Sequence, residues 1–457
     1  MKLPETSDTI AALATPPGAG ALAIIRISGP AAFSAASSFL APAPRTPEHS
    51  AARLLSVKNG PALVDRAVVV FFRAPASYTG DDTVEITCHG SPYIIRTILN
   101  LAVKSGARPA EPGEFTLRAF LNGKMDLAQA EAVGELIAAG SAGAHRAAIT
   151  QAEGGLSAEV RGIRTALAGL LAEIEARLDD SYEEIPALET RAFARRAASA
   201  RKKTLALASG FGAGKGIRDG VKVVITGAPN SGKSSLLNAL LGYDRAMVSR
   251  RAGTTRDTLE ASLDIDGFSI LFTDTAGLNA RAASPLEREG IKRAEKAIAL
   301  ADMVVLVKDA SLKESPGDRR AERETARLAL KGARLLRVLN KADLPAEKSR
   351  PASGCLRVSA KTGSGLSKLK AALVAEQKKV FRDGTQAVVT SARHFSALSG
   401  AAAELAGLEA VLKRSRPPLE LAAEHLRGAL EALASLLGET TPEEVLGNIF
   451  RNFCVGK

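Results

Sequence analysis

One stretch constrains the fold of this chain more than any other. Residues Val221–Leu241 read VKVVITGAPNSGKSSLLNALL, an apolar strand-like run, a glycine loop and a helix-forming segment that begins near Lys233. The letters GAPNSGKS have the G-x-x-x-x-G-K-[ST] spacing of a phosphate-binding loop. In such a loop, backbone N–H groups and the N-terminus of the following helix hold polyphosphate charge. A plain glycine turn is the alternative, and the flanking strand and helix patterns disfavour it.

The side chains of this loop predict how a nucleoside triphosphate is held. Lys233 would reach the β- and γ-phosphates, and the Ser234 hydroxyl would hold Mg²⁺. The loop residues that we expect to contact the nucleotide are Asn230, Ser231, Gly232, Lys233, Ser234 and Ser235.

Two later motifs supply groups that can sense the γ-phosphate. The segment Gly253–Asp257 (GTTRD) offers a threonine hydroxyl that can reach Mg²⁺ only when the γ-phosphate is present, which is how a loop becomes a switch. The segment Asp274–Gly277 (DTAG) follows a strand-like run. We expect Asp274 to hold the water shell of the metal and the Gly277 amide to sense the γ-phosphate.

A third motif predicts which base is bound. Asn340–Asp343 (NKAD) follows the strand-like run Leu335–Leu339, and the Asp343 carboxylate can accept hydrogen bonds from both N1–H and the N2 amine of guanine. Adenine lacks that pair of donors, so the site should select guanine. Ser359–Lys361 (SAK) would add a backbone amide for guanine O6. Together these motifs, in this order, predict a Ras-like GTPase domain over residues 220–376.

One departure decides how hydrolysis would be catalysed. Leu278 follows DTAG, at the place where GTPases of the Ras kind carry the glutamine that orients the attacking water. We expect Asn230 to offer its side-chain oxygen to a monovalent cation where the charge of an arginine finger would otherwise lie. Glu287 is the residue that we expect to position the water. Glu289 and Glu260 compete for that role, and a plain helix-surface role for Glu287 is the alternative.

The first part of the chain, residues 1–125, is predicted to be an α+β domain. The runs Ala21–Ser28, Ala67–Arg73 and Thr83–Cys88 have the β-branched and aromatic bias of strands. Pro92–Ser105 is typical of a helix packed on them.

Two further stretches, 126–219 and 377–457, are predicted to be all-helical. Apolar residues recur in them at helical spacing, as in Leu167, Leu170, Leu171, Ile174 and Leu178, and again in Leu398, Ala402, Leu405, Leu408 and Leu412. Because helical stretches flank the GTPase segment on both sides, we expect one helical domain into which the GTPase domain is inserted. The fold class is therefore multidomain α/β.

Two features of the first helical stretch need an interpretation. Gly210–Gly216 (GFGAGKG) resembles a second phosphate loop, but Ser209 stands where the first glycine is required and no strand precedes it, so we interpret it as a decoy. A basic run also falls here, and a solvated helix face is favoured over an RNA-facing patch. Its members are Arg191, Arg195, Arg196, Arg201, Lys202 and Lys203.

The composition narrows the setting. A formal net charge of +12 suits a polyanionic partner, although the same charge could serve solubility. The three cysteines, Cys88, Cys355 and Cys454, lie far apart and predict neither a disulfide framework nor a zinc site. Apolar runs such as Met303–Val307 are far shorter than the roughly 20 residues of a membrane span. We therefore expect a soluble, cytoplasmic protein with no membrane contact.

Long blocks of the sequence resemble the MnmE (TrmE) family of tRNA modification GTPases. These blocks are DTIAALATPPGAGALAIIRISG, SYTGDDTVEITCHG, RPAEPGEFTLRAFLNGKMDLAQAEAV, the series of GTPase motifs, and the ending GETTPEEVLGNIFRNFCVGK. The resemblance implies a homodimer formed through the N-terminal domain, residues 1–125, which would bind formyl- or methylene-tetrahydrofolate. It also implies work with the flavoprotein MnmG on the wobble uridine of certain tRNAs, giving 5-carboxymethylaminomethyl or 5-aminomethyl uridine.

The resemblance also implies site residues. The folate contacts would be Arg26, Glu85, Lys124 and the terminal Lys457, which suit the glutamate tail and the pterin of a folate. Potassium would be held by Asn230, Ser249, Arg251 and Thr254, magnesium by Ser234 and Thr255, with Glu287 as the catalytic glutamate beside Asn230 and Lys233. Because Arg250-Arg251 replaces the pair usual in the family, we expect only backbone contacts to K⁺ there. The nucleotide contacts expected beyond the loop are Ser249, Thr254, Thr255, Asp274, Thr275, Ala276, Gly277, Asn340, Lys341, Asp343, Ser359, Ala360 and Lys361.

A GTP-dependent ribosome-assembly or regulatory switch of the Era or EngA kind is the alternative function. It would share the GTPase core but bind no folate. Such factors typically carry a KH domain or a second GTPase domain, and no GXXG-bearing KH pattern occurs near the end of this sequence.

Overall fold

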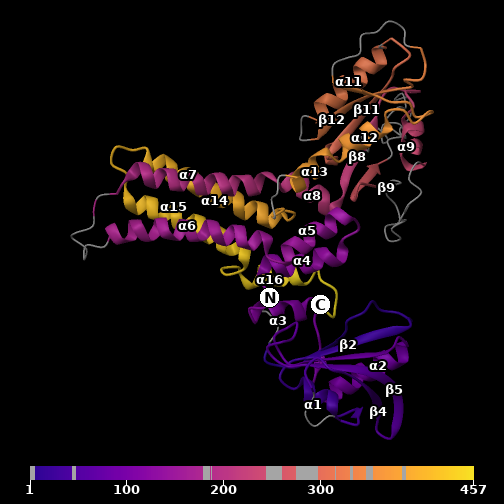
Figure 1. Cartoon of the computed structure of the whole chain (residues 1–457), viewed down its shortest axis with the longest axis vertical. Helices are drawn as coiled ribbons and strands as arrows, with labels where there is room; N and C mark the ends of the chain where they lie inside the picture. Colours follow the sequence, from indigo (N-terminus) through magenta and orange to yellow (C-terminus); the bar gives the residue numbers. More distant parts are fainter. Residues whose placement is uncertain are drawn as a thin grey trace, which may run out of the picture. The chain divides into compact units, whose positions relative to one another are not determined.

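The computed structural model describes residues 6–43, 48–178, 186, 188–242, 260–273, 297–313, 315–329, 333–345, 354–382 and 387–457 (Figure 1). It separates into two compact units. One contains residues 1–134, 152–197 and 403–457, and the other contains residues 135–151 and 198–402. The domain boundaries drawn from the sequence stay predictions.

The N-terminal part of the first unit is built on a seven-stranded sheet of order β3-β4-β5-β6-β2-β1-β7. Its strands are β1 Ile10–Leu13, β2 Leu22–Ser28, β3 Leu40–Ala41, β4 Ala52–Asn59, β5 Ala62–Phe72, β6 Thr83–His89 and β7 Arg108–Pro109. The helices are α1 Ala32–Ser37, α2 Pro92–Lys104 and α3 Glu114–Leu121. The three predicted strands and the predicted helix are confirmed.

Alternation along β2 and β6 separates a core face from a polar face of this sheet. Ile25, Ile27, Val84 and Ile86 are buried in the core with α2. Arg26, which lies between Ile25 and Ile27, therefore projects from the opposite face, as the period of two in a strand requires. The core thus sets where a charged side chain of β2 can act.

The helices of the first unit include α4 Leu127–Ala138, α6 Gly155–Leu178, α7 Thr190–Ser209, α14 Ala392–Leu412, α15 Leu419–Leu437 and α16 Glu443–Phe450, of which α4, α7 and α14 extend into the second unit. α6 and α15 pack along each other, and the predicted apolar residues Leu167, Leu170 and Ile174 are buried. α14 is long and apolar enough to cross a membrane by length and composition. Its buried residues recur at helical spacing, as expected of a helix that packs one face against a core.

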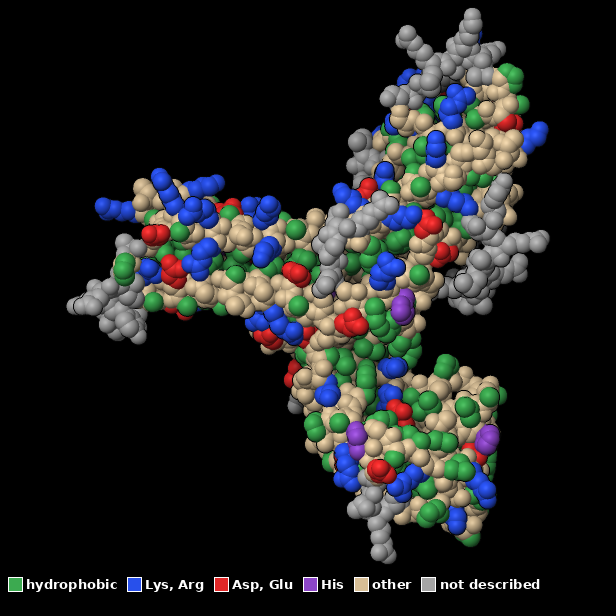
Figure 2. Space-filling view, viewed as in Figure 1, with side chains coloured by type: hydrophobic (Ala, Val, Ile, Leu, Met, Phe, Trp, Pro, Cys, Tyr) green, Lys and Arg blue, Asp and Glu red, His purple; other side chains and the backbone are tan. Residues whose placement is uncertain are grey.

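The basic run falls on α7, and Figure 2 shows Lys and Arg side chains along the surface over this helix. Phe193, Ala197 and Ala200 form its buried face. Arg191 and Lys202 are exposed, as is Arg195. This arrangement fits both a solvated helix face and an RNA-facing patch, so the two interpretations stay open.

The second unit contains a six-stranded sheet of order β13-β12-β11-β8-β10-β9. Its strands are β8 Val221–Thr226, β9 Glu260–Ile265, β10 Phe268–Thr273, β11 Met303–Asp309, β12 Arg334–Asn340 and β13 Cys355–Arg357. Among the strands described in this sheet, only β9 pairs antiparallel. The helices described in this unit include α5 Ala142–Ala152, whose last residue falls in the first unit, α8 Phe211–Asp219, α9 Lys233–Gly242, α11 Pro316–Ala329, α12 Leu366–Leu373 and α13 Ala375–Arg382.

The sheet order explains where a ligand can bind in this unit. The run Met303–Val307 in β11 is buried without alternation, because parallel strands are covered on both faces. The carboxyl ends of β8, β11 and β12 meet at one edge, where the segments after Thr226, Asp309 and Asn340 begin. In open α/β sheets, ligands bind outside this edge. The predicted Ras-like domain, inserted between the helical stretches, is confirmed.

The decoy interpretation of Gly210–Gly216 is also confirmed. Gly210 is the N-cap of helix α8, residues 211–216 lie within that helix, and helix α7 precedes them. A Cβ on Gly214 would lie 2.1 Å from the carbonyl oxygen of Val389, so the glycine serves close packing. The three cysteines are free thiols.

Candidate functional site

The phosphate loop joins β8 to α9 as predicted. Gly227 has φ +148°, and a Cβ there would lie 2.1 Å from the carbonyl oxygen of Val307. Gly232 has φ +89°, and a Cβ there would meet the side-chain nitrogen of Asn340 at 2.2 Å. Both positions therefore require glycine. Asn230, the proposed cation ligand, has φ +62° and is exposed at the tip of the loop.

Lys233 folds back over the loop in this structure. Its Nζ donates to the carbonyl oxygens of Gly227 at 3.1 Å and Ala228 at 2.9 Å. Burial lowers the pKa of Lys233 from its ordinary value. Ser234 and Ser235 are exposed in the first turn of α9, where the backbone N–H groups are oriented for an anion.

The guanine motif is tied to the phosphate loop by Asn340. Its Nδ2 donates to the carbonyl oxygen of Ser231 at 3.1 Å, and its Oδ1 accepts from the backbone N–H of Ala360 at 3.1 Å. Asn340 is 1% exposed, so these contacts are shielded from water. One buried amide therefore joins the loop, the NKAD motif and the SAK motif into one site.

The Asp343 carboxylate, which is predicted to bind guanine, is held by a hydrogen bond from Ser359. Asp343 accepts a hydrogen bond from Ser359 Oγ at 2.6 Å, and this bond lowers the pKa of Asp343. Ser359 Oγ also accepts from the N–H of Thr362 at 3.1 Å. The Asp343 side chain is thus ionised and oriented as an acceptor, which guanine requires.

Lys341 has a partner that sequence reasoning missed. Its Nζ lies 2.6 Å from Asp309 Oδ2, and Asp309 ends β11 directly opposite Asn340 in the strand register. The signal in the sequence is a carboxylate at the end of a buried run, next to the strand that carries the guanine motif.

Apart from Asn230 and Lys233, the residues predicted to act in catalysis and to sense the γ-phosphate lie outside the described residues. This applies to Ser249, Arg251, Thr254, Thr255, Asp274, Thr275, Ala276, Gly277, Leu278, Glu287 and Glu289, and to the side chain of Glu260. Of the predicted nucleotide and metal residues, those of the phosphate loop, the NKAD motif and the SAK motif are brought together.

A second candidate site lies on the polar face of the N-terminal sheet. Arg26 and Glu85 are directly opposed in the β2–β6 register, and Arg26 Nη2 lies 2.7 Å from Glu85 Oε1. Arg26 Nη1 also donates to the carbonyl oxygen of Gly456 at 3.2 Å. The chain end, with Lys457, is therefore bound next to Arg26.

Aromatic rings line this cluster, and sequence reasoning did not single them out. The Arg26 guanidinium lies 5.4 Å from the ring centroid of Tyr78 and 5.5 Å from that of Phe115. Lys457 Nζ lies 5.9 Å from the Tyr78 centroid. Burial, with the neighbouring Arg26 charge, lowers the pKa of Lys457. Lys124 donates to the carbonyl oxygen of Pro75 at 2.9 Å, on the loop that carries Tyr78.

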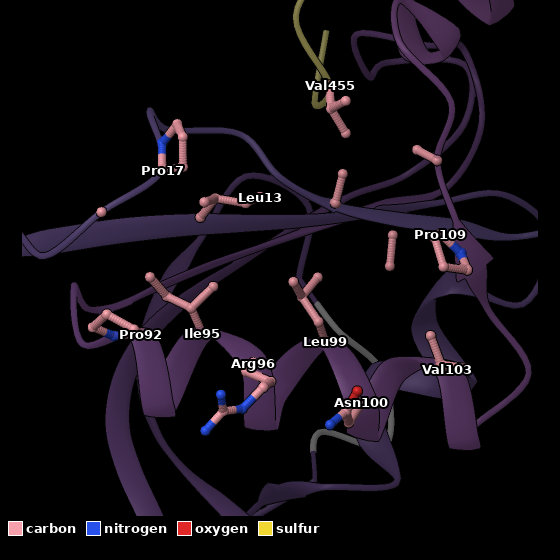
Figure 3. Close-up of a pocket in the computed structure, with 14 residues that line it drawn as sticks. Leu13, Pro17, Pro92, Ile95, Arg96, Leu99, Asn100, Val103, Pro109 and Val455 are labelled. Atoms are coloured by element: carbon pink, nitrogen blue, oxygen red, sulfur yellow. The ribbon is translucent and has the colours of Figure 1, made fainter.

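An apolar groove of about 500 Å³ lies between β1 and α2 in the same domain (Figure 3). Leu13, Ile95 and Leu99 line it, and Figure 3 shows Arg96 and Asn100 as its polar side chains from α2. Val455, two residues before Lys457, also lines it. The C-terminal tail therefore borders both the groove and the Arg26 cluster. The volume is in the range of small-molecule sites.

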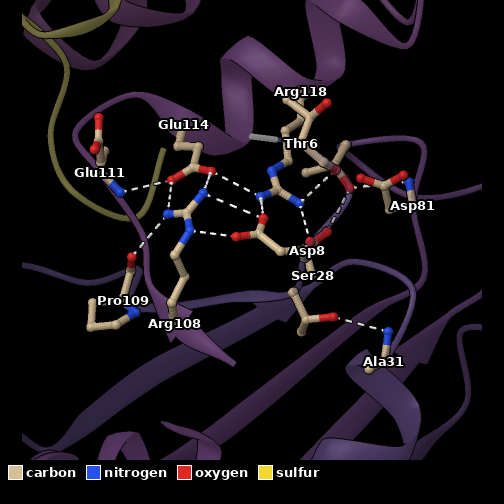
Figure 4. Close-up of polar contacts among 12 residues, drawn as sticks. Thr6, Asp8, Ser28, Ala31, Asp81, Arg108, Pro109, Glu111, Glu114 and Arg118 are labelled. Atoms are coloured by element: carbon tan, nitrogen blue, oxygen red, sulfur yellow. Dashed lines mark hydrogen bonds and ion pairs between the residues drawn. The ribbon is translucent and has the colours of Figure 1, made fainter. Parts of the chain in front are cut away.

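A buried ionic network fixes helix α3 beside this cluster (Figure 4). Glu114 accepts from Arg108 Nη2 at 2.6 Å and from Arg118 Nη2 at 2.9 Å. Arg118 Nη2 also binds the Asp8 carboxylate at 2.6 Å. The side chains of Glu114 and Arg118 are 0% and 1% exposed. The network thereby holds Phe115, the next residue of α3, in place under Arg26.

The fold and the first site define a P-loop GTPase with a Ras-like core. Comparison with known proteins then identifies the family. A family model described as the MnmE helical domain matches residues 127–454, and one described as the GTP-binding protein TrmE N-terminus matches residues 9–124. The chain belongs to the MnmE family of tRNA modification GTPases.

Full-length relatives support this assignment. The tRNA modification GTPase MnmE of Thermus thermophilus is 41% identical over 454 residues, covering 98% of this chain and 99% of the relative. The protein of the same name from Nitrosomonas eutropha is 40% identical and covers 99% of this chain and 100% of the relative. Matches over both the N-terminal and the helical parts favour this family over the Era or EngA alternative.

Solved structures resemble the chain over a smaller part. The G domain of the T. maritima FeoB iron transporter is 25% identical and covers 34% of this chain and 98% of its own, with a TM-score of 0.26. Aquifex aeolicus Era bound to GDP and aluminium fluoride is 25% identical and covers 34% of this chain and 56% of its own, with a TM-score of 0.27.

Proposed function

We propose that this protein hydrolyses GTP to GDP and phosphate, and that hydrolysis serves the modification of tRNA. The observation that carries the proposal is the Asn340 amide, which joins a phosphate loop to two guanine-recognition motifs. Asp343 is held as an acceptor by Ser359, which suits the N1–H and N2 donors of guanine. The names of the full-length relatives supply the link to tRNA.

The residues of the loop suggest how the phosphates are handled. Lys233, now bonded to loop carbonyl groups, would turn its ammonium to the β- and γ-phosphates. Ser234 and Thr255 would hold Mg²⁺, which neutralises charge on the phosphates. Asn230 would offer an oxygen to K⁺, together with Ser249, Arg251 and Thr254, and Glu287 would position the attacking water.

The finer function is a modification of the wobble uridine with a one-carbon unit. In this proposal the protein is a cytoplasmic homodimer that works with MnmG, and the N-terminal domain binds formyl- or methylene-tetrahydrofolate. Arg26, Lys457 and Lys124 offer cations for the glutamate tail, and Glu85 offers a carboxylate for the pterin. The neighbouring ring of Tyr78, which is only partly buried, supports the binding of a flat heterocycle.

Three experiments test separate parts of this proposal. GTP turnover in KCl should exceed turnover in NaCl, and equal rates would remove the cation mechanism. Isothermal titration with formyl-tetrahydrofolate should show binding to the full-length protein. Mass spectrometry of tRNA from a deletion strain should show loss of the wobble modification, and an unchanged uridine would contradict the proposed role.

A further inference from the structure

We infer that Asp309 is a positioning residue for guanine recognition, because it holds the side chain of Lys341 in the NKAD motif against the phosphate loop. The inference rests on the proposed GTP function and adds a residue that lies outside all of the predicted motifs.

Both oxygens of the Asp309 carboxylate accept hydrogen bonds. Oδ2 accepts from Lys341 Nζ at 2.6 Å. Oδ1 accepts from both the backbone N–H and the hydroxyl of Ser311, at 2.9 Å and 2.6 Å. Because Ser311 fixes one oxygen, the other cannot rotate freely, and the ammonium of Lys341 is held at a defined point.

The environment favours a charged Asp309. The side chains of Asp309 and Lys341 are 12% and 34% exposed. Burial alone would raise the pKa of Asp309, but the hydrogen bonds from Lys341 and Ser311 outweigh it and hold the pKa below its ordinary value. An ion pair that is partly withdrawn from water is screened less than one on an open surface.

The position of the Lys341 stem shows what the ion pair to Asp309 fixes. Lys341 has φ +62°, in the left-handed region, and a Cβ on Gly232 would lie 3.9 Å from Lys341 Cε. The methylene stem of Lys341 therefore runs beside the phosphate loop. A free lysine stem samples many rotamers, and an anchored ammonium restricts them.

The anchored stem lies close to the group that reads guanine. Lys341 and Asp343 share one turn, which is closed by the hydrogen bond from the N–H of Leu344 to the carbonyl oxygen of Lys341 at 3.1 Å. Long methylene stems cover apolar surface while their charged ends stay bound elsewhere. When the ammonium is bound to Asp309, the methylene stem is held where it can pack on the face of the purine. Asp343 binds the edge of the same purine.

The test uses full-length protein and titration of GDP. We expect Asp309→Asn to weaken GDP binding about 10- to 100-fold, the size of one lost charge-assisted contact. Lys341→Met keeps an unbranched stem but removes the ammonium, so it should weaken binding similarly. The double variant should be no weaker than either single variant, because both remove the same interaction. Asp309→Glu, which keeps the charge, should restore part of the affinity.

The matched control is Glu322→Gln. Glu322 of α11 accepts from Lys308 Nζ of β11 at 2.7 Å and from Arg337 of β12 at 2.8 Å, so its ion pairs join the helix to the same two strands and do not involve the NKAD motif. We expect its GDP affinity to match that of the unchanged protein. A purely structural role for Asp309 would instead lower the melting temperature of the Asn variant without changing its GDP affinity below the transition.

Three outcomes would overturn the inference. The first is unchanged or tighter GDP binding by Asp309→Asn. The second is a full further loss of GDP affinity when Asp309→Asn is added to Lys341→Met. The third is an equal loss of GDP affinity in Glu322→Gln. Asp343→Asn serves as the separate check on the proposed function. If that variant binds GDP normally, the guanine assignment itself fails, whatever Asp309 does.

Discussion

The two candidate sites are assembled in different ways. The guanine side of the GTPase site uses two short segments, residues 340–343 and 359–361, which the carboxyl edge of a parallel sheet brings together. The N-terminal cluster joins Arg26 to Glu85 across an antiparallel strand pair and to Gly456, which is 430 positions away in the chain. The first site is built from contiguous motifs, and the second from pairing register and a bound chain end.

This difference decides what changes in each site can do. In the GTPase site, the Asp343 side chain is exposed, so a substitution there should change nucleotide choice and leave the fold intact. In the N-terminal site, the same elements hold the fold and the cluster, because α3 carries Phe115 and the ionic network together. Substitutions behind that cluster should therefore affect stability before they affect binding.

The largest effect is expected from Glu114→Gln. Its carboxylate is fully buried between Arg108 and Arg118, and removing one partner of a buried ionic group typically costs about 3–5 kcal/mol. Hydrogen exchange of the amides in β6 and α3 should show this loss, while GDP affinity stays unchanged. Glu111→Gln is the control, because that side chain is exposed. Equal protection in both variants would contradict the supporting role of the network.

Asp343→Asn should have the next largest effect. It replaces the acceptor for N1–H and N2 with an amide that cannot accept both hydrogen bonds, so GTP affinity should fall by about 100-fold or more. Xanthosine triphosphate carries an oxygen in place of the N2 amine and should gain affinity. Titration of both nucleotides measures the change, and formyl-tetrahydrofolate binding serves as the internal control. An equal loss of affinity for GTP and for formyl-tetrahydrofolate would contradict the distinction between the two sites.

The GTPase site could be predicted from local sequence because each motif keeps its chemistry wherever the sheet places it. Asn340 and Asp343 were predicted on that ground and lie together. Asp309 was missed because its role depends on the register of β11 against β12, which no local pattern encodes.

The N-terminal cluster could be predicted only through the family resemblance. Nothing in the spacing of Arg26, Glu85 and Lys457 indicates contact, since strand pairing and the docking of the tail create it. Tyr78 and Phe115 lie in sequence segments that resemble the family, but they were not predicted as site residues. An aromatic residue in a strand-rich segment is ordinarily part of a core. β1 and β4 were also missed; the former is short and rich in alanine, and the latter is largely exposed.

A moderate effect is expected from Arg26→Met. The variant keeps an unbranched apolar stem but removes the guanidinium, with its charge-assisted contacts to Glu85 and Gly456 and its position over Tyr78 and Phe115. We expect formyl-tetrahydrofolate affinity to fall about 10- to 100-fold, as for the loss of a hydrogen bond to a charged group. Arg53→Met is the matched control, because Arg53 forms an exposed ion pair in the same sheet. An unchanged titration for Arg26→Met would remove Arg26 from the proposed folate site.

The smallest effect is expected from pH, because acid weakens the network without removing it. Burial would raise the pKa of Glu114, but hydrogen bonds from Arg108, the Glu111 N–H and Arg118 outweigh burial and lower it. The pKa of Asp8 is likewise lowered by Arg108 and Arg118 against its burial. A carboxylate with a depressed folded-state pKa contributes stability that is present above its unfolded pKa and lost as pH falls through the folded value.

Amide protection in β6 and α3 should therefore decline below about pH 4 in the unchanged protein. Glu114→Gln should show a shallower decline than the unchanged protein, and identical pH profiles would show that the ionised network does not hold α3 in place.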